Sequence, residues 1–389
     1  MIYLDHNATT PTRPEVREAM LPYLGEEFGN PSSIYERGRL ARNALDEARG
    51  RVAQLAGVHP SQVIFTGGGT EAGNLALRGV VLRAVAEGRL GRVLVGATEH
   101  SAVLEPAEDL AAFGIEVVKL PVDAAGRVTP ETLENEISAD TILVSVMAAN
   151  NETGVLNDTS ALAAIAREHG VTFHTDAVQV PGKLPLDFTA IGANLMNLSA
   201  HKLGGPKGVG ALVTDNAVDL LPLVTGGGQE GGRRAGTENL PGIVGFGVAA
   251  EIAMQEQAEH AVAMRELRDE LERRLASRPA TSLFAADAER LPNTLFFGLE
   301  GMDGETVQMG LDRQGIAVST GSACHSESTE PSHVLTAMGI PEALARGAIR
   351  VSFGRGNNMQ DIDALLNALD SLASALPTGA MQGGGPVGW

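Results

Sequence analysis

One segment near the middle of the chain reads Leu195-Met196-Asn197-Leu198-Ser199-Ala200-His201-Lys202-Leu203-Gly204-Gly205-Pro206. Its apolar beginning predicts a buried β-strand, and its Gly-Gly-Pro ending predicts a turn that leaves room for a bulky ligand. Lys202 lies between the two. Most lysines are solvated, but a lysine that is desolvated in a pocket has a lowered pKa and can form a Schiff base. The segment therefore indicates a reactive lysine at the end of a strand.

Six further apolar runs resemble the one that precedes Lys202. They are rich in Val, Ile and Leu rather than strictly alternating, which is typical of strands that are buried on both faces. Helical stretches such as Thr159–His169 lie between several of them. This alternation predicts an α/β fold with a mostly parallel, seven-stranded sheet covered by helices. The six runs span residues 63–66, 92–95, 115–118, 141–147, 171–175 and 210–214.

The composition changes after this region, where residues 243–277 read as one long amphipathic helix. Met264, Leu267, Leu271 and Leu275 fall on one stripe of it. Such a helix often bridges two domains, although an ordinary surface helix would show the same pattern. Later runs predict a smaller α+β domain, with strands at 293–299, 316–319 and 348–353 and a helix at 361–372. We predict a large domain at 13–257, a small domain at 1–12 and 258–376, and a flexible tail at 377–389.

Composition narrows the function classes. The 389 residues carry a formal net charge of −19, which disfavours direct contact with nucleic acid or anionic membranes. The single cysteine, Cys324, excludes an internal disulfide and a four-thiolate metal site within one chain. No basic, apolar leader is visible at 1–6, and no apolar run reaches the roughly 18–20 residues of a membrane span. We therefore expect a cytoplasmic protein.

Two other segments complement Lys202. Gly67-Gly68-Gly69-Thr70-Glu71 follows a strand and precedes an apparent helix, so its backbone N–H groups and a helix N-terminus could hold an anion. Asp176 ends another strand, where ligands bind in open α/β sheets. Taken singly, the first is equally a glycine-rich turn and the second is more often a helix cap. Together with Lys202 they supply a phosphate cradle, an acid for a pyridinium nitrogen and a Schiff-base amine, the set that pyridoxal phosphate needs.

The chain resembles the cysteine desulfurases of the NifS/IscS type, within the fold-type-I pyridoxal-phosphate enzymes. Eight segments carry this resemblance, in the right order over about 350 residues, and their combination is highly specific although each is weak alone. They are Tyr3-Leu4-Asp5-His6-Asn7-Ala8-Thr9-Thr10, Phe28-Gly29-Asn30-Pro31-Ser32-Ser33, Thr98-Glu99-His100, Asn150-Asn151-Glu152-Thr153-Gly154, Ser199-Ala200-His201-Lys202, Arg234-Ala235-Gly236-Thr237, Gly321-Ser322-Ala323-Cys324 and Ile349-Arg350-Val351-Ser352.

The resemblance implies a role for each site residue. Lys202, Cys324 and His100 would be catalytic, with Lys202 moving the α-proton and His100 stacking on the cofactor ring. Asn151 and Arg350 would bind substrate, the arginine gripping a carboxylate with its two-pronged guanidinium. Thr237 would reach the phosphate from a second subunit, which implies a homodimer. The cofactor-binding residues would be Gly69, Thr70, His100, Asn151, Asp176, Gln179, Ser199, His201, Lys202 and Thr237.

Cys324 lies in a small, polar segment that would make a poor core. A few per cent of an unperturbed thiol is thiolate at neutral pH, so it is already a usable nucleophile. By resemblance, it takes the sulfur of L-cysteine as a persulfide, leaving L-alanine. It then delivers the sulfur to a scaffold for iron–sulfur cluster assembly, or to tRNA thiolation. Cys324 could also be a transient iron–sulfur ligand shared with a scaffold. His325 and Glu327 depart from the family pattern and could alter its reactivity.

Two alternatives stay open at this point. The same cofactor serves selenocysteine lyases, kynureninases and small-amino-acid aminotransferases, but the last two have no use for Cys324. A non-catalytic sulfur or metal carrier could use Cys324 with His325 across a dimer. One cysteine and one histidine per chain make a poor site, because zinc and iron–sulfur clusters normally take about four ligands.

Overall fold

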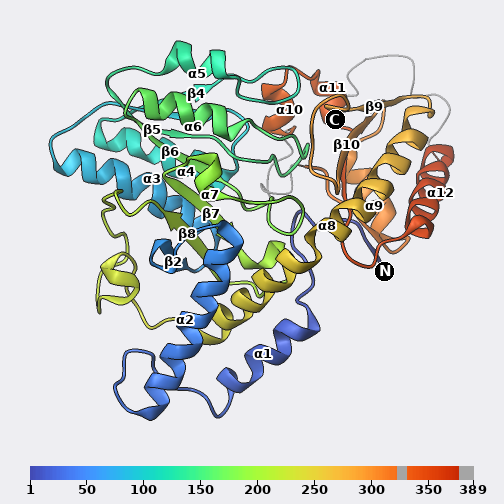
Figure 1. Cartoon of the computed structure of the whole chain (residues 1–389). Helices are drawn as coiled ribbons and strands as arrows, with labels where there is room; N and C mark the ends of the chain where they lie inside the picture. Colours follow the sequence, from blue (N-terminus) through green and yellow to red (C-terminus); the bar gives the residue numbers. More distant parts are fainter. Residues whose placement is uncertain (322–330, 376–389) are drawn as a thin grey trace, which may run out of the picture.

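The computed structural model describes residues 1–321 and 331–375 (Figure 1). Its larger part is built on a seven-stranded sheet of order β2-β8-β7-β6-β5-β3-β4. β8 is antiparallel to both β2 and β7, and the other neighbours are parallel. The predicted sheet is therefore confirmed. Its strands are β2 (Val63–Thr66), β3 (Arg92–Gly96), β4 (Glu116–Leu120), β5 (Thr141–Ser145), β6 (Thr172–Asp176), β7 (Leu195–Ser199) and β8 (Gly210–Thr214).

Both faces of this sheet are covered by helices. Successive residues of a strand point to opposite faces and pack in two different cores. Ile64 packs in one core and Phe65 in the other. One face carries α3 (Gly69–Ala86) and α4 (Ser101–Asp109). The opposite face carries a larger set, namely α2 (Glu36–Ala56), α5 (Pro130–Glu136), α6 (Thr159–Glu168), α7 (Phe188–Ile191) and the beginning of α8 (Leu240–Ala276). Burial on two sides explains why the strands read as continuous apolar runs.

Helix α8 joins the two parts of the molecule. Its 37 residues reach about 55 Å at the usual helical rise. Phe246, in its first half, is buried in the core of the large sheet. The predicted stripe of Met264, Leu267, Leu271 and Leu275 is buried in a second core. The helix therefore bridges two cores, with α1 (Pro14–Leu24) and α2 packed along its first half (Figure 1).

The second core belongs to a three-stranded antiparallel sheet of order β12-β10-β9. The sequence pattern missed its edge strand β9, and the strand expected at 316–319 is shorter than predicted. The N-terminal strand β1 pairs in parallel with β11, so residues far apart in sequence meet here. The elements are β9 (Thr281–Leu283), β10 (Thr294–Leu299), α9 (Gly304–Asp312), β11 (Ile316–Ala317), α10 (His333–Ala337), α11 (Glu342–Ala345), β12 (Ala348–Ser352), α12 (Met359–Ala375) and β1 (Ile2–Tyr3).

The domain boundaries at 13–257 and at 1–12 with 258–376 stay a prediction, and the tail at 377–389 lies outside the described residues. Across residues 1–321 and 331–375, no helix combines the length and the apolar character needed to cross a membrane.

Replacing Leu271 with alanine should destabilise the protein, because this fully buried side chain of α8 packs in the small core. We expect a loss of about 2–5 kcal/mol of unfolding free energy in urea titrations. Val262→Ala on the same helix is the control, since Val262 is 55% exposed and should change stability by no more than about 0.5 kcal/mol. Equal effects of the two substitutions would contradict the bridging role of α8.

Candidate active site

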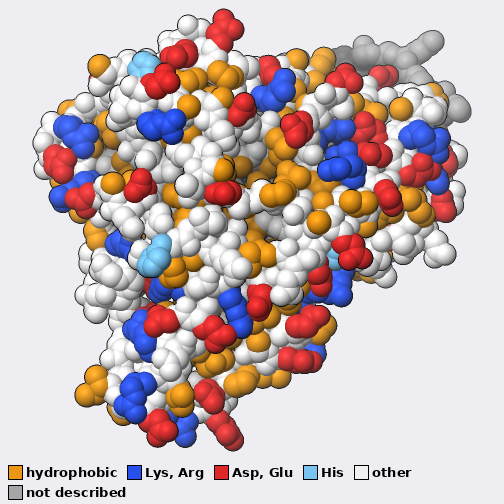
Figure 2. All heavy atoms as spheres, viewed as in Figure 1, with side chains coloured by type: hydrophobic (Ala, Val, Ile, Leu, Met, Phe, Trp, Pro, Cys, Tyr) orange, Lys and Arg blue, Asp and Glu red, His pale blue; other side chains and the backbone are white. Residues whose placement is uncertain are grey.

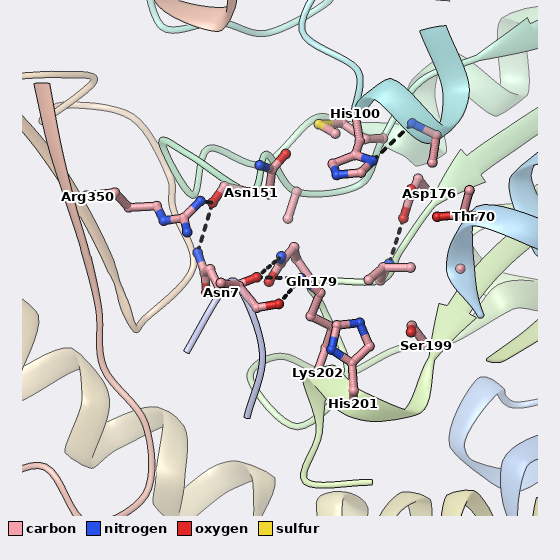
Figure 3. A pocket seen from close by; sticks show the side chains of 16 residues that line it. Asn7, Thr70, His100, Asn151, Asp176, Gln179, Ser199, His201, Lys202 and Arg350 are labelled. Atoms are coloured by element: carbon pink, nitrogen blue, oxygen red, sulfur yellow. Dashed lines mark hydrogen bonds between the residues drawn. The ribbon is translucent and has the colours of Figure 1, made fainter. Parts of the chain in front are cut away.

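A cavity of about 340 Å³ lies where the parallel strands of the large sheet end, and β12 of the small sheet adds to its wall (Figure 3). Ten residues that the sequence predicted for the site line this one cavity. The cavity is also lined by Asn7 and Ala8, to which sequence reasoning gave no role. The ten are Gly69, Thr70, His100, Asn151, Asp176, Gln179, Ser199, His201, Lys202 and Arg350.

Lys202 ends the short 3-10 helix η3 (Ala200–Lys202) that follows β7. Its Nζ donates to the backbone oxygens of Asn7, at 2.5 Å, and of Ala8, at 2.9 Å. The amine therefore points into the cavity and meets the N-terminal segment. Asn7 and Ala8 belong to a segment that carries the family resemblance, but the sequence did not indicate that they contact Lys202, almost 200 positions away.

Asp176 ends β6 and is 8% exposed. Its Oδ1 accepts a hydrogen bond from the backbone N–H of Val178 at 2.9 Å. Burial raises the pKa of this carboxyl, while that hydrogen bond and the electrostatic effects of the nearby His174 and Lys202 act in the opposite direction. A buried carboxylate of this kind gains most from a cationic N–H donor, which a protonated pyridine nitrogen would supply.

The N-terminus of α3 forms one end of the cavity with Gly69 and Thr70. A Cβ built at Gly69 would lie 3.0 Å from Val178 Cγ2, a contact tighter than is usual, so glycine suits the close approach of the α3 terminus to the segment after β6. Ser199 and His201 face the same end (Figure 3). Burial and the charges of Lys202 and Lys207 lower the pKa of His201 to about 4, which makes it a neutral donor or acceptor at neutral pH. Helix N–H groups, hydroxyls and a lysine nearby suit a phosphate.

His100 caps the N-terminus of α4, where its Nδ1 accepts the backbone N–H of Ala102 at 3.1 Å. The hydrogen bond fixes the ring above the cavity, as Figure 3 shows. Because Nδ1 is an acceptor, the proton of the neutral ring is carried by Nε2. His100 thus caps a helix, as a purely structural histidine would. It also lines the cavity, as the resemblance predicts.

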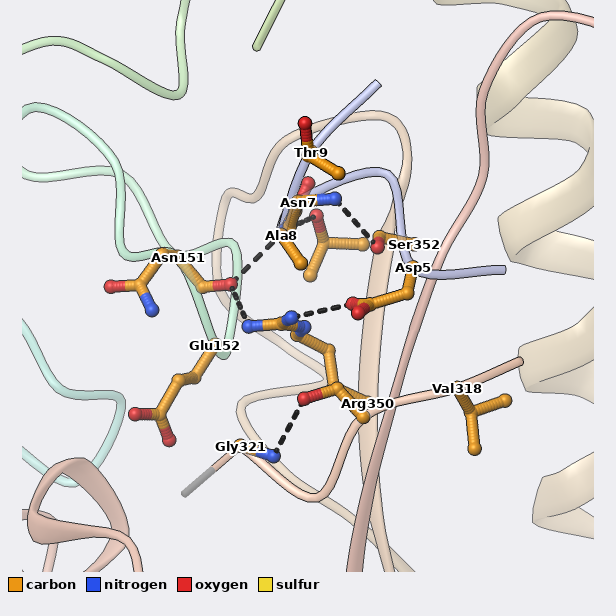
Figure 4. A network of polar contacts seen from close by, with 12 residues as sticks. Asp5, Asn7, Ala8, Thr9, Asn151, Glu152, Val318, Gly321, Arg350 and Ser352 are labelled. Atoms are coloured by element: carbon orange, nitrogen blue, oxygen red, sulfur yellow. Dashed lines mark hydrogen bonds and ion pairs between the residues drawn. The ribbon is translucent and has the colours of Figure 1, made fainter. Parts of the chain in front are cut away.

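Arg350 on β12 supplies a buried guanidinium from the small sheet (Figure 4). Its Nη2 pairs with Asp5 Oδ1 at 2.6 Å, and its Nη1 donates to the backbone oxygen of Asn151 at 3.1 Å. Asp5 is a functional residue that sequence reasoning missed. A guanidinium has five N–H donors, so these two contacts orient Arg350 and leave donors for a substrate carboxylate.

Glu152 is a second buried acid beside the cavity. Ser332 donates its hydroxyl to Glu152 Oε2 at 2.5 Å, and a Cβ at Gly321 would meet the same oxygen at 2.9 Å. Burial raises the pKa of Glu152 to about 7, against the opposing effects of Ser332 and the charge of Arg350. Glu152 lies in a segment that carries the family resemblance, but no feature of the sequence indicated that its side chain would be buried.

Two predicted residues are not part of this cavity. Thr237 is exposed and does not line it, which is compatible with the expectation that it serves another subunit. Cys324 lies outside the described residues. Among the residues that the structure does describe, no three acidic, histidine or cysteine side chains form a candidate metal site.

The chain matches the family described as aminotransferase class-V over residues 2–365. The chain belongs to this family. A cysteine desulfurase IscS from Dictyoglomus turgidum is 44% identical over 97% of this chain and 95% of the relative. The solved structure of a NifS-like protein superposes with a TM-score of 0.90 and 38% identity, covering 96% of this chain and all of the other. A structure titled "SspA in complex with cysteine" superposes with a TM-score of 0.80 and 34% identity, covering 91% of this chain and 99% of the other.

Within the class-V aminotransferases, this protein therefore belongs with the cysteine desulfurases of the NifS/IscS type, which confirms the resemblance and the enzyme class. Pyridoxal phosphate is the cofactor of this family. The cavity fits it on structural grounds. Lys202, the buried Asp176 and the glycine cradle at Gly69 face one another across a single space. The roles of individual residues stay predictions.

Replacing Glu152 with glutamine should change how stability depends on pH. Since the folded pKa of about 7 lies above the ordinary 4.5, the native protein holds this proton more tightly than the unfolded chain. Wild-type stability should therefore fall by about 3 kcal/mol from this group as the pH rises from about 4.5 to 7. In the variant this part of the fall should be absent. Urea titrations across this range, with the exposed Glu300→Gln as control, measure the difference, and parallel profiles for wild type and Glu152→Gln would contradict the assignment.

Proposed function

We propose that this protein is a pyridoxal-phosphate-dependent cysteine desulfurase that converts L-cysteine to L-alanine and passes the sulfur on through Cys324. The observation that supports this most is the convergence of Lys202, Asp176 and Arg350 on one cavity. The lysine, the acid and the arginine match, in that order, the aldehyde carbon of this cofactor, its ring nitrogen and the carboxylate of an amino acid joined to it. The similarity to a protein solved with cysteine favours cysteine as the amino acid.

Lys202 and Asp176 would hold the two ends of the cofactor ring system. When bound, pyridoxal phosphate draws electron density from the carbons of an attached amino acid. The carboxylate of Asp176 would accept a hydrogen bond from the N–H of the protonated ring nitrogen and so keep that nitrogen protonated, a contact that its burial strengthens. The amine of Lys202 would hold the aldehyde carbon and, once displaced by substrate, take the proton from the α-carbon. Its docking site on the oxygens of Asn7 and Ala8 keeps it within reach.

His100 and Gln179 would orient the ring. His100 would cover one ring face, with its Nε2–H directed away from the α4 terminus that holds Nδ1. Gln179 would donate to the ring oxygen. Gly69, Thr70, Ser199 and His201 would hold the phosphate by backbone and side-chain donors at the end of α3.

Arg350 and Asn151 would bind the substrate. The guanidinium would pair with the α-carboxylate in a fork geometry. Since Asp5 and the Asn151 backbone already hold the guanidinium, little side-chain entropy would be lost on binding.

Cys324 would receive the sulfur. Its thiolate would attack the substrate sulfur, so that an S–S bond forms as the C–S bond breaks. The electron pair of the broken C–S bond would stay with the β-carbon of the substrate. Addition of a proton there would give the methyl group of alanine. The resulting persulfide would pass its outer sulfur to an acceptor protein for iron–sulfur cluster assembly or tRNA thiolation. A scaffold could also share Cys324 as a transient iron–sulfur ligand. We propose a cytoplasmic location, since a lone thiol is kept reduced there.

Two substitutions separate the two halves of this reaction. Lys202→Ala should abolish alanine formation, because Lys202 is the one lysine that lines this cavity among residues 1–321 and 331–375, and it would hold the cofactor covalently. Cys324→Ala should keep the yellow colour of the bound cofactor and still bind cysteine, but it should no longer release sulfur. Visible spectra before and after L-cysteine, with alanine and sulfide quantified, test both. Ser326→Ala is the matched control in the same segment. Sulfide release at the wild-type rate by Cys324→Ala would rule out the persulfide role.

We also propose that the enzyme acts as a homodimer. Several large apolar side chains lie exposed where α1 ends and α2 begins, at the lower end of the view in Figure 2. Large apolar side chains exposed along one end of a molecule are a feature of interaction surfaces. A second copy covering it would also give the exposed Thr237 a partner site. The exposed side chains are Leu21, Leu24, Phe28, Ile34, Tyr35 and Leu40.

A complementation experiment tests whether Thr237 acts across subunits. Thr237→Ala alone should weaken cofactor binding by about tenfold or more, through loss of a hydrogen bond to a charged group. Co-expression with Lys202→Ala should restore one intact site in each mixed dimer, because that site combines Lys202 of one chain with Thr237 of the other. Separately tagged mixed dimers measure this. Mixed dimers that bind the cofactor no better than Thr237→Ala would show that Thr237 acts within its own chain.

A further inference from the structure

Lys183 is a buried lysine to which the proposed reaction gives no role. It is 5% exposed, and its Nζ donates to Gln179 Oε1 at 2.8 Å and to Asn7 Oδ1 at 3.2 Å. Both acceptors are neutral amides. Within residues 1–321 and 331–375, no ion pair to Lys183 is formed, and its charged neighbours are the like charges Lys202 and Arg350. Burial, aided by these charges, places its pKa well below the ordinary value. A lysine so placed costs folding free energy.

The contacts of Lys183 fix which way the amide of Gln179 faces. The Lys183 amine donates to Gln179 Oε1, so the amide oxygen faces Lys183. At the other end, Gln179 Nε2 donates to the backbone oxygen of Asn7 at 3.0 Å, and a carbonyl can only accept. A flipped amide would lose both hydrogen bonds. The cavity is thus offered the N–H₂ end of Gln179 and not its oxygen (Figure 3).

The same amine orients Asn7, whose amide is satisfied at both ends. Its Oδ1 accepts from Lys183 and from Asn293 Nδ2, and its Nδ2 donates to the Asn151 backbone and to Thr294 Oγ1. The backbone oxygen of Asn7 then receives both Gln179 and the reactive Lys202. Lys183 therefore touches neither cofactor nor substrate space directly, but contacts two residues that do.

We propose that Lys183 is a positioning residue that presents the Gln179 amide as a hydrogen-bond donor to the ring oxygen of the cofactor. This inference rests on the proposed function, because it assumes that the cofactor occupies the cavity. Without Lys183, only the hydrogen bond from Gln179 Nε2 to the Asn7 carbonyl would hold the amide, so a larger share of molecules would turn the amide oxygen toward the ring oxygen, where the two acceptors repel each other.

The test compares four purified holoenzymes: Lys183→Met, Gln179→Ala, the double variant, and Lys119→Met as control. Lys119 is half-exposed and paired with Glu108, so its loss should leave the site unchanged. Lys183→Met should shift the visible absorption of the bound cofactor at fixed pH and without substrate. It should also lower kcat about tenfold while KM for cysteine stays within about twofold, as loss of one buried contact allows. Adding Lys183→Met to Gln179→Ala should change neither readout further.

Two results would overturn the proposal. One is a wild-type spectrum and kcat in Lys183→Met, and the other is a double variant whose losses multiply. If Lys183→Met does not fold, Lys183→Gln takes its place, because a glutamine can present either end and imposes no orientation on Gln179. It should give the same spectral shift. The spectrum needs no cysteine, so a wild-type enzyme that forms no alanine would refute the desulfurase proposal and leave this result intact.

Discussion

The active site depends on the hydrogen bonds of one short N-terminal segment. Asn7 lies between the two sheets: its N–H donates to Ser352 on β12, and its backbone oxygen accepts from Gln179 and Lys202. The pairing of β1 with β11 holds this segment from the other side. Because these polar groups are buried, each one that lost its hydrogen-bond partner would cost free energy. The hydrogen bonds therefore hold the N-terminal segment in one conformation. The catalytic cavity inherits its shape from that arrangement.

Charge is distributed unevenly between the molecule and its site. The whole chain carries −19, yet Lys202, Lys183 and Arg350 gather at the cavity wall or directly behind it. A concave region with low-dielectric walls concentrates the field of such groups, which favours a phosphate and a carboxylate. Asp5 offsets part of this charge by pairing with Arg350. The cavity wall thus holds the cationic Lys202 and Arg350 beside an acid, Asp176, in a chain whose net charge is negative.

The sequence predicted most of the large sheet because its strands are buried on both faces, so their identity is a local signal. Lys202 and Asp176 could be predicted for the same reason, since Asp176 ends such a strand and Lys202 lies three residues beyond the end of another. Asn7 and Lys183 could not. An asparagine is most often a turn residue and a lysine is most often solvated, so only contacts with residues far along the chain reveal their roles. The strand β9 was missed because its three residues are half-buried at an edge.

A common physical feature links the residues that were predicted and those that were missed. His100 is fixed by the backbone of α4, Arg350 by Asp5, and Gln179 by Lys183. Each group that faces the cavity therefore uses one side of its polar atoms on the protein and offers the other to the ligand. Groups held in this way need not reorganise when charge develops during reaction, which is how preorganised sites stabilise transition states. The buried polar network is thus the part of the fold that converts two packed cores into a site with defined donors and acceptors.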